Sequence, residues 1–238
     1  MIGCRCDVCR SADPRDTRSR PSIYLELSDG LRVLVDTTPD LRAQALRMSI
    51  DRVDAILFTH SHADHVMGLD EVRRFNMLQK TSIPCYGDPY TMKDLRRTFS
   101  YVFESNEQGG GIPKLHLYPL AGPFSIGHQE IHPVPVLHGR RSVLGFRIGA
   151  FAYLTDCNAI PDASWPLLEG LDTLVLDALR HRPHPTHFTV AEALGVVKRL
   201  KPGRTWFTHI CHDLPHAATN AALPDGVELA YDGLTFDI

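Results

Sequence analysis

The sequence contains no long hydrophobic run and little net charge, and each absence excludes a class of protein. No apolar segment approaches the roughly 20 residues that a membrane-spanning helix needs, which argues against a helical membrane protein. The first residues also lack the apolar core of a signal peptide, so we expect a cytoplasmic protein. A formal charge of −3 gives no overall attraction to nucleic acid or to an anionic membrane, so neither is expected as a partner.

Internal repeats and low-complexity stretches are absent as well. The 238 residues suffice for one domain with a large core, and 43% hydrophobic residues is ordinary for a globular protein. Predicted strands and helices interleave, which favours an α/β (α+β) fold. The predicted strands are a hairpin (23–27 and 31–35), 53–58, an antiparallel meander over 115–155, 173–176 and 204–208. The predicted helices begin at Thr38-Pro39-Asp40, cover about 70–78 and 92–102, and begin again at the capping box of Thr189 and Glu192.

A loop dense in metal-binding side chains follows the predicted strand 53–58. Four such side chains stand within six residues: His60, His62, Asp64 and His65. A single loop histidine is usually only hydrated, whereas three with a carboxylate at a strand end indicate a metal site. Imidazole and carboxylate ligands together suit zinc, manganese or iron, and a site left open on one side can activate water.

Three other predicted strands end in residues that could bind metal, namely His138, Asp156 and His209. Taken alone, each of them is more simply a polar residue of the core or the surface. Asp177, which ends the strand 173–176, could accept a hydrogen bond from a metal-binding histidine and orient its ring.

Three of the six cysteines form a cluster near the N-terminus, Cys4, Cys6 and Cys9. A chain expected in the cytoplasm does not need disulfides, so a metal explains the cluster better. Three thiolates in one turn leave a tetrahedral zinc ion short of one ligand. The alternative is three free thiols on a frayed terminus.

In their order along the chain, these residues resemble the metallo-β-lactamase superfamily, in which His-x-His-x-Asp-His is followed by a distant His, a distant Asp and a final His. The resemblance extends over nearly the whole chain. It implies one hydrolase domain over residues 1–238 with a four-layer αβ/βα sandwich, and two divalent ions, zinc or manganese, that activate a hydroxide. One ion would be bound by His60, His62 and His138 and the other by Asp64, His65 and His209, with Asp156 bridging both.

Within the superfamily, two further features resemble the PhnP-like subgroup of phosphoribosyl cyclic phosphodiesterases. The cysteine cluster, in a loop over residues 3–20, matches a structural zinc site whose fourth ligand would be His212. His187 matches a histidine that protonates the leaving oxygen, and with Asp64 it is expected to be catalytic. The resemblance therefore implies hydrolysis of a small cyclic phosphodiester, and it also suggests a homodimer.

The sequence departs from the subgroup at its start. Family members have a strand and a Leu-Gly-Thr-Gly type of turn before the cysteines, whereas this chain starts Met1-Ile2-Gly3-Cys4. We therefore expect the first strand of the family fold to be missing.

Other functions stay open on the sequence alone. Cleavage of a lactone, thioester or β-lactam uses the same metal ligands, so the substrate pocket would decide. A tRNA 3′-end nuclease would need a long basic arm, which this chain does not offer, and a non-catalytic metal-binding protein would be indicated by an incomplete ligand set. No role is assigned to His181 or His184, and Arg140-Arg141 either binds a second phosphate or is only hydrated.

Overall fold

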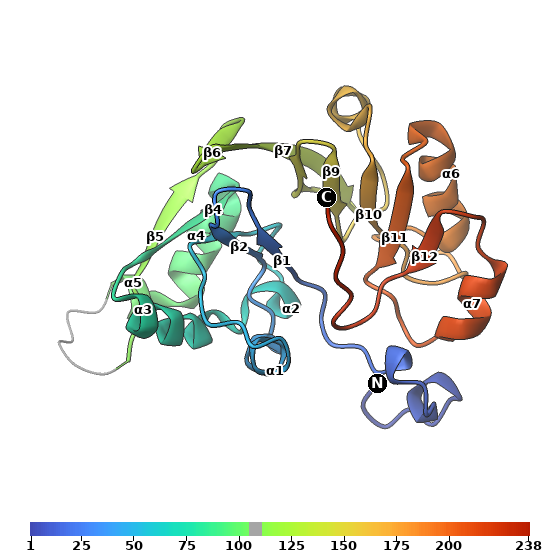
Figure 1. Ribbon diagram of the computed structural model, residues 1–238, viewed down its shortest axis with the longest axis horizontal. Coiled ribbons are helices and arrows are strands. Elements are labelled where there is room, and N and C mark those ends of the chain that lie inside the picture. The colour runs from blue at the N-terminus through green and yellow to red at the C-terminus, as the bar shows by residue number, and fades with distance from the viewer. Residues whose placement is uncertain (105–110) are drawn as a thin grey trace. The chain divides into compact units, whose positions relative to one another are not determined.

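The computed structural model describes residues 1–104 and 111–238, which form two compact units (Figure 1). Unit 1 consists of Met1–Ser19 and His132–Ile238, and unit 2 consists of Arg20–Ile131. Each unit combines helices with a β-sheet, so the predicted α/β fold class is confirmed.

Unit 2 is built on a five-stranded sheet in the order β1-β2-β3-β4-β5. Its strands are β1 (Ile23–Glu26), β2 (Arg32–Val35), β3 (Ala55–Leu57), β4 (Ile83–Gly87) and β5 (Leu115–Pro119). Strands β1 and β2 form the predicted antiparallel hairpin, and all other neighbours in this sheet are parallel. Parallel strands end at the same edge of a sheet, so the residues that follow β2 and β3 lie at one edge.

Short helices cover one face of this sheet. They are α1 (Leu41–Arg47), α2 (Ala63–Val66), the 3-10 helix η3 (Leu69–Val72), α3 (Arg73–Gln79), α4 (Pro89–Thr98) and α5 (Ser100–Phe103). Leu41, Val66, Phe75 and Leu95 of these helices belong to one buried cluster with Ile56 of β3. Burial of these side chains anchors the helices and fixes the loop between β3 and α2 at the sheet edge.

A seven-stranded sheet in the order β12-β11-β10-β9-β8-β7-β6 supplies the strands of unit 1. These are β6 (Phe124–Ile126), β7 (Gln129–His138), β8 (Arg141–Ile148), β9 (Phe151–Leu154), β10 (Thr173–Asp177), β11 (Arg204–Thr208) and β12 (Val227–Leu229). β6 and the part of β7 up to Ile131 are counted with unit 2. Strands β9 to β12 are parallel, so Asp156, Asp177 and His209 follow or end strands at one edge.

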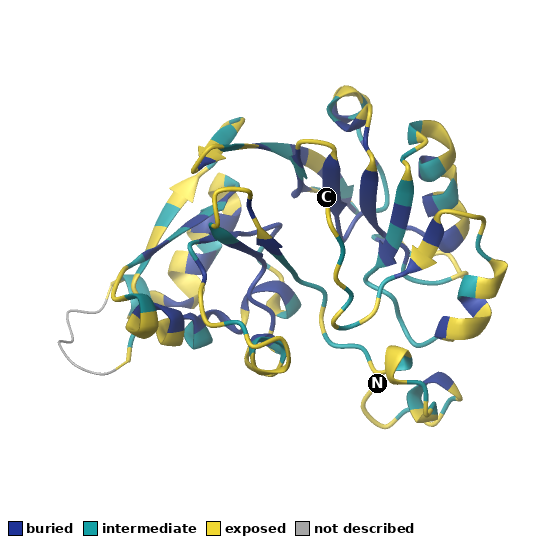
Figure 2. Cartoon of the chain, viewed as in Figure 1, coloured by how far each residue is buried: buried dark blue, intermediate teal, exposed yellow. Residues whose placement is uncertain are grey.

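Helix α6 (Val190–Leu200) packs on this sheet through an apolar stripe. Val190, Ala193 and Val196 share a buried cluster with Leu174 and Leu176 of β10, and Figure 2 shows β10 buried along its length. The helix starts with the predicted capping box, in which the Thr189 side chain accepts from the backbone of Glu192. The other helices of unit 1 are η1 (Val8–Arg10), η2 (Pro14–Asp16), η4 (Asp162–Leu168) and α7 (His216–Ala222).

The N-terminal segment is attached to α7 and to the loop before it (Figure 1). The carboxylate of Asp16 accepts a hydrogen bond from the backbone N–H of His216 at 2.8 Å. The guanidinium of Arg18 donates to the carbonyl oxygens of Cys211 at 2.7 Å and Leu214 at 2.6 Å. Residues 200 positions apart in the chain are therefore joined within unit 1.

Two predictions about individual elements were wrong. β5 is not part of an antiparallel meander but pairs in parallel with β4, because α4 and α5 act as the crossover that a parallel connection requires. α1 begins at Leu41 rather than at Pro39, since the Thr38 hydroxyl accepts from the N–H of Asp40 in a turn that precedes the helix.

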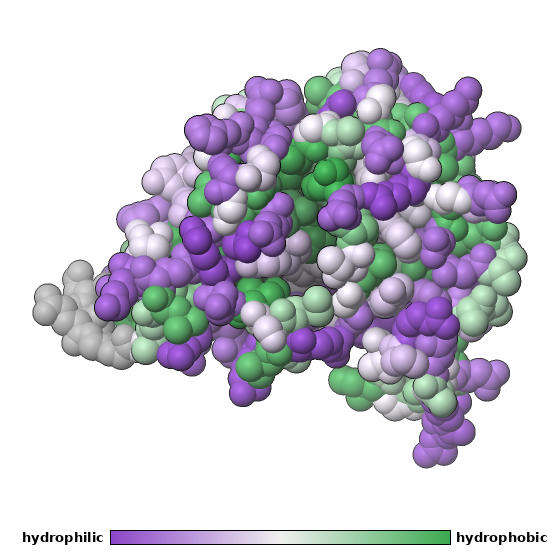
Figure 3. Space-filling model, in the orientation of Figure 1, coloured by the Kyte–Doolittle hydropathy of each residue, from purple (hydrophilic) through white to green (hydrophobic). Residues whose placement is uncertain are grey.

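Among the described residues, no helix combines the length and the apolar character needed to cross a membrane. On the face drawn in Figure 3, hydrophilic and apolar side chains are interspersed.

Two glycines of unit 1 give opposite predictions for substitution by alanine. A Cβ atom at Gly145 of β8 would lie 2.8 Å from the carbonyl oxygen of Tyr153, whereas a Cβ at Gly195, in the exposed interior of α6, meets nothing within 4 Å. We expect Gly145→Ala to lower the free energy of unfolding by about 1–3 kcal/mol and Gly195→Ala to raise it by about 0.5–1 kcal/mol. Urea denaturation of both variants measures the difference, and a Gly145→Ala protein as stable as the parent would contradict this packing.

Candidate metal centre

Three residues of the candidate centre, two of them predicted ligands, follow strands in the left-handed backbone conformation. Asp36, Asp156 and His209 have φ angles of 65°, 51° and 56°, and they come directly or two residues after β2, β9 and β11. Non-glycine residues rarely adopt this conformation, and such residues cluster at functional sites.

Unit 2 brings four of the predicted ligands together in the loop after β3. The ring centroid of His60 lies 4.5 Å from that of His62 and 4.3 Å from that of His65. Nε2 of His65 is 3.8 Å from Oδ2 of Asp64, which also forms an ion pair of 3.3 Å with Arg20. His60 and His65 are fully buried, whereas His62 is exposed.

The buried carboxylate of Asp36 organises this loop, although the sequence analysis did not identify it. Oδ1 accepts from the N–H of Thr59 at 2.9 Å, and Oδ2 accepts from the Thr59 hydroxyl and from Nδ1 of His65, each at 2.7 Å. Because the Thr59 hydroxyl donates to Asp36, its oxygen accepts from Nδ1 of His60 at 3.1 Å. Burial raises the pKa of Asp36, and the hydrogen bonds from His65 and Thr59 oppose that shift.

Unit 1 brings together the three remaining predicted ligands. Nε2 of His209 lies 3.3 Å from Oδ1 of Asp156, and Nε2 of His138 lies 3.9 Å from Oδ2 of the same carboxylate. Nδ1 of His138 donates to the carbonyl oxygen of Thr186 at 2.8 Å. Burial lowers the pKa of His138, so its imidazole is neutral at neutral pH, the form that binds a metal ion.

His187 lies beside this group and is held by Asp177. Its Nδ1 donates to Oδ2 of Asp177 at 2.7 Å, and its Nε2 lies 4.0 Å from Oδ2 of Asp156. Asp177 is fully buried and also accepts from the N–H of Cys157 at 2.8 Å. Asp177 therefore orients a histidine, as the sequence suggested, but the histidine is His187 and not one of the predicted ligands.

Four imidazoles share one tautomer, because Nδ1 of His60, His65, His138 and His187 donates to an oxygen acceptor. In a neutral ring the lone pair then resides on Nε2, the nitrogen that can bind a cation or exchange a proton. Buried imidazoles next to carboxylates form a donor set that suits a divalent metal ion. Asp156, His187 and His209 offer ligand atoms that all lie within 4.8 Å of one another.

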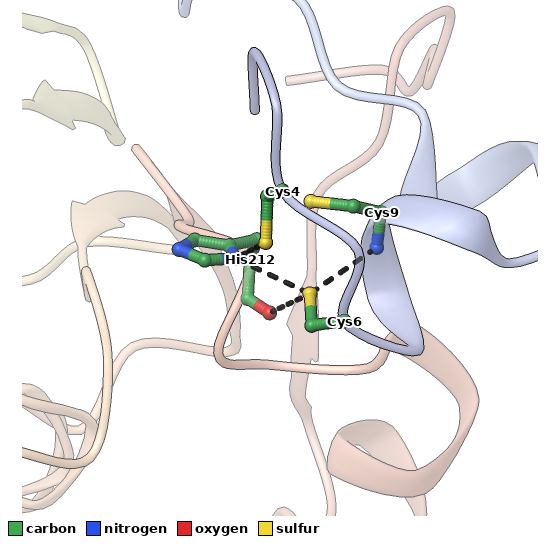
Figure 4. Close-up of side chains that lie close together, drawn as sticks. All are labelled: Cys4, Cys6, Cys9 and His212. Carbon is green, nitrogen blue, oxygen red and sulfur yellow. Dashed lines mark hydrogen bonds between the residues drawn. The ribbon is translucent and has the colours of Figure 1, made fainter.

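The cysteine cluster and His212 point toward one another in unit 1 (Figure 4). Their three sulfur atoms and one ring nitrogen all lie within 4.8 Å of one another. Nδ1 of His212 is 3.4 Å from Sγ of Cys4 and 3.3 Å from Sγ of Cys6. A tetrahedral zinc ion with bonds of about 2.3 Å places its sulfur ligands about 3.8 Å apart, so this set fits zinc.

The hydrogen bond from the backbone of Cys9, followed by that from His212, lowers the pKa of Cys6. A lowered thiol pKa favours the thiolate, which is the metal-binding form of cysteine.

Four residues without an assigned role lie on two segments of unit 1. Arg140 belongs to the turn between β7 and β8, Arg141 is the first residue of β8, and His181 and His184 belong to the loop before His187. Arg140 and His181 are exposed, whereas the ring of His184 packs 5.0 Å from that of His187.

Replacing Asp36 tests whether its carboxylate organises the loop after β3. An asparagine keeps the tolerance for the left-handed backbone but cannot accept from Thr59 and His65 together, so we expect Asp36→Asn to lower the free energy of unfolding by about 1–3 kcal/mol. The exposed Asp51→Asn substitution is the charge-matched control and should change stability by less than about 0.5 kcal/mol. Chemical denaturation of metal-free protein measures both, and equal effects would contradict the assigned role of Asp36.

Comparison with known proteins identifies the family and the fold of this chain. A family model described as "Beta-lactamase superfamily domain" matches residues 31–210. The crystal structure of a diphosphatase from the PhnP family is 46% identical, with a TM-score of 0.91 over 98% of this chain and 89% of that one. Zinc-bound PqqB from Methylobacterium extorquens has the same fold at 20% identity, with a TM-score of 0.79 over 100% of this chain and 95% of that chain.

One curated relative is longer than this chain. An octanoyltransferase of Porphyromonas gingivalis (strain ATCC BAA-308 / W83) is 35% identical over 237 residues, which are 98% of this chain but 48% of that protein. This chain thus spans about half the length of that relative. The chain belongs to the beta-lactamase superfamily and is a PhnP-like member with the metallo-β-lactamase fold, a fold that implies binding of a divalent metal.

Proposed function

We propose that the protein hydrolyses a phosphorus–oxygen bond in a small phosphate ester, most simply a cyclic phosphodiester, with two metal ions. The observation that carries the proposal is the pair of Asp177 and His187, which presents an imidazole Nε2 near Asp156. The PhnP-family diphosphatase, at 46% identity, supports phosphoryl chemistry and adds a diphosphate bond as a related substrate class.

The two groups of predicted ligands would bind a single pair of ions, and residues 1–238 would form one hydrolase domain. The first ion would be bound by His60, His62 and His138, the second by Asp64, His65 and His209, and Asp156 would bridge them. When bound, such ions stabilise negative charge on phosphoryl oxygens and lower the pKa of a water molecule. The tautomers of His60, His65 and His138 support this role, since each carries its lone pair on Nε2.

His187 would donate a proton from Nε2 to the leaving oxygen. The carboxylate of Asp177 accepts from Nδ1 of His187, so it holds the ring in place and stabilises the protonated imidazole. Asp177 is therefore a positioning residue and His187 the catalytic one. Asp64, which the sequence analysis also placed among catalytic residues, would act through the metal that it binds.

A separate zinc ion would be bound by Cys4, Cys6, Cys9 and His212. The spacing of the four ligand atoms and the lowered pKa of Cys6 support a structural site. This ion would fasten the N-terminal loop to the segment that follows β11. A cytoplasmic location remains a prediction from the sequence, and a homodimer and a small-molecule substrate remain predictions from the resemblance.

Removal of His212 tests the separate zinc site. We expect His212→Ala to lose about one metal equivalent per chain, because three thiolates alone bind zinc less tightly, while His212→Cys retains it. Metal analysis after dialysis measures the content, with His128→Ala as the control. Unchanged metal content in His212→Ala would contradict the site.

Substrate choice tests the proposed reaction. We expect the metal-loaded protein to hydrolyse a cyclic nucleotide and bis-p-nitrophenyl phosphate, or a dinucleotide with a diphosphate bond, faster than a lactone or a thioester. Turnover of only the lactone or the thioester would contradict phosphoryl transfer.

The leaving group tests the role of His187. A sugar alkoxide needs a proton to depart and p-nitrophenolate does not, so we expect His187→Ala to slow cyclic nucleotide hydrolysis about 100-fold or more and to affect bis-p-nitrophenyl phosphate far less. Asp177→Asn should follow the same pattern with a smaller loss, and the exposed His116→Ala is the control. Equal losses on both substrates, together with reduced metal content, would instead identify His187 as a metal ligand.

A further inference from the structure

A hydrogen bond joins the loop after β3, which carries four predicted metal ligands, to helix α4. The hydroxyl of Ser61, the residue between His60 and His62, donates to Oδ2 of Asp94 at 2.7 Å. Oδ1 of the same carboxylate accepts from the guanidinium of Arg97 at 3.1 Å. All of these residues belong to unit 2. One oxygen of Asp94 therefore accepts from the loop, and the other accepts from the surface of the helix.

Helix α4 is attached to the sheet of unit 2, so the carboxylate of Asp94 is carried by a fixed backbone. The side chain of Asp88 caps the helix, because it accepts from two backbone N–H groups of the first turn. Met92 and Leu95, on either side of Asp94 in the sequence, are buried in one cluster with Phe58, which directly follows β3. The helix is therefore packed against the strand that leads into the loop.

The backbone is held on both sides of His62. Before it, Ser61 is bonded to Asp94, and after it the carbonyl oxygen of His62 accepts from the N–H of His65 at 3.0 Å at the start of α2. The side chain of His62 is exposed, so packing does not fix its ring as it fixes the buried rings of His60 and His65. The position of this predicted ligand therefore depends on its backbone.

The two hydrogen bonds of Asp94 differ in how far water reaches them. The side chain of Asp94 is 17% exposed, whereas that of Arg97 is 78% exposed, so water and salt screen their ion pair. An exposed ion pair within one helix is usually worth little. The bond to Ser61 instead joins two elements 33 residues apart, and it alone connects Asp94 to the loop of the candidate ligands among the bonds described here.

We propose that Ser61 and Asp94 are a positioning pair that holds His62 in place for the first ion of the proposed centre. The inference rests on the proposed function and adds two residues to it. Neither side chain would touch the metal or the substrate, and Asp94 would act on His62 through Ser61. Groups that orient metal ligands in this way change metal affinity by about 10- to 100-fold, so the pair predicts a loss confined to one of two ions.

Titration with manganese, after removal of bound metal, tests the inference. Manganese prefers imidazole and carboxylate ligands to thiolates, so its binding reports the candidate centre and not the cysteine cluster. We expect the parent protein to bind two manganese ions. Ser61→Ala and Asp94→Ala should each weaken one ion by about tenfold or more and change the other by less than about twofold. The double variant should lose no more than either single variant, because both remove the same hydrogen bond. Electron paramagnetic resonance of the free ion measures the binding.

Three further variants separate positioning from effects of charge or folding. Asp94→Asn keeps an oxygen that can accept from Ser61, so it should retain the affinity within about threefold although it removes the charge. Arg97→Ala removes the exposed ion pair, keeps the bond to the loop and should behave in the same way. Ser100→Ala, which removes an exposed serine at the start of α5, is the matched control.

Unchanged affinity for both ions in Ser61→Ala and Asp94→Ala would overturn the inference, even with a loss of stability in urea, because the bond would then be only structural. An equal loss in Asp94→Asn would overturn it as well, since the charge and not the hydrogen bond would then matter. A parent protein that binds fewer than two manganese ions would contradict the proposed function, and the positioning pair would fall with it. Two ions bound equally well by every variant would contradict the pair alone.

Discussion

The candidate centre depends on two buried carboxylates that each hold an imidazole by its Nδ1–H. A carboxylate removed from water costs several kcal/mol unless donors surround it, so Asp36 and Asp177 can be buried only with such partners. Asp36 receives three hydrogen bonds and Asp177 receives two. The same hydrogen bonds fix the tautomers and ring positions of His65 and His187. The bonds that stabilise the two buried carboxylates therefore also orient the two imidazoles for the chemistry of the site.

The backbone conformation at the strand ends of the site also lowers the free energy of unfolding. Non-glycine residues in the left-handed conformation cost about 1–3 kcal/mol each, and Asp36, Asp156 and His209 all adopt it. Packing of the strands on their helices supplies the rigidity that keeps these residues in place, because β9 and β10 are buried along their whole length. The segment after β11 contributes to both candidate sites. His209 lies next to Asp156, whereas His212, three residues later, lies among the cysteines.

The sequence predicted much of this arrangement because local patterns carried it. The hairpin of β1 and β2 and the capping box of α6 were confirmed by geometry. The zinc site of the three cysteines and His212 stays a prediction, and their ligand atoms lie within 4.8 Å of one another. Asp36 was missed, although it follows the apolar run Val33–Val35 at a strand end as Asp156 follows β9, and that likeness could have identified it. The partner of Asp177 and the parallel pairing of β5 could not be predicted, since both depend on contacts between residues that no sequence spacing relates.

The central proposal is that the seven predicted ligands bind one pair of metal ions. Crystals grown with manganese, and measured at a wavelength where manganese scatters anomalously, test it most directly. The account predicts two anomalous peaks, one within bonding distance of His60, His62 and His138 and the other within bonding distance of Asp64, His65 and His209, with Asp156 contacting both. A single ion held by Asp156, His187 and His209 would contradict it.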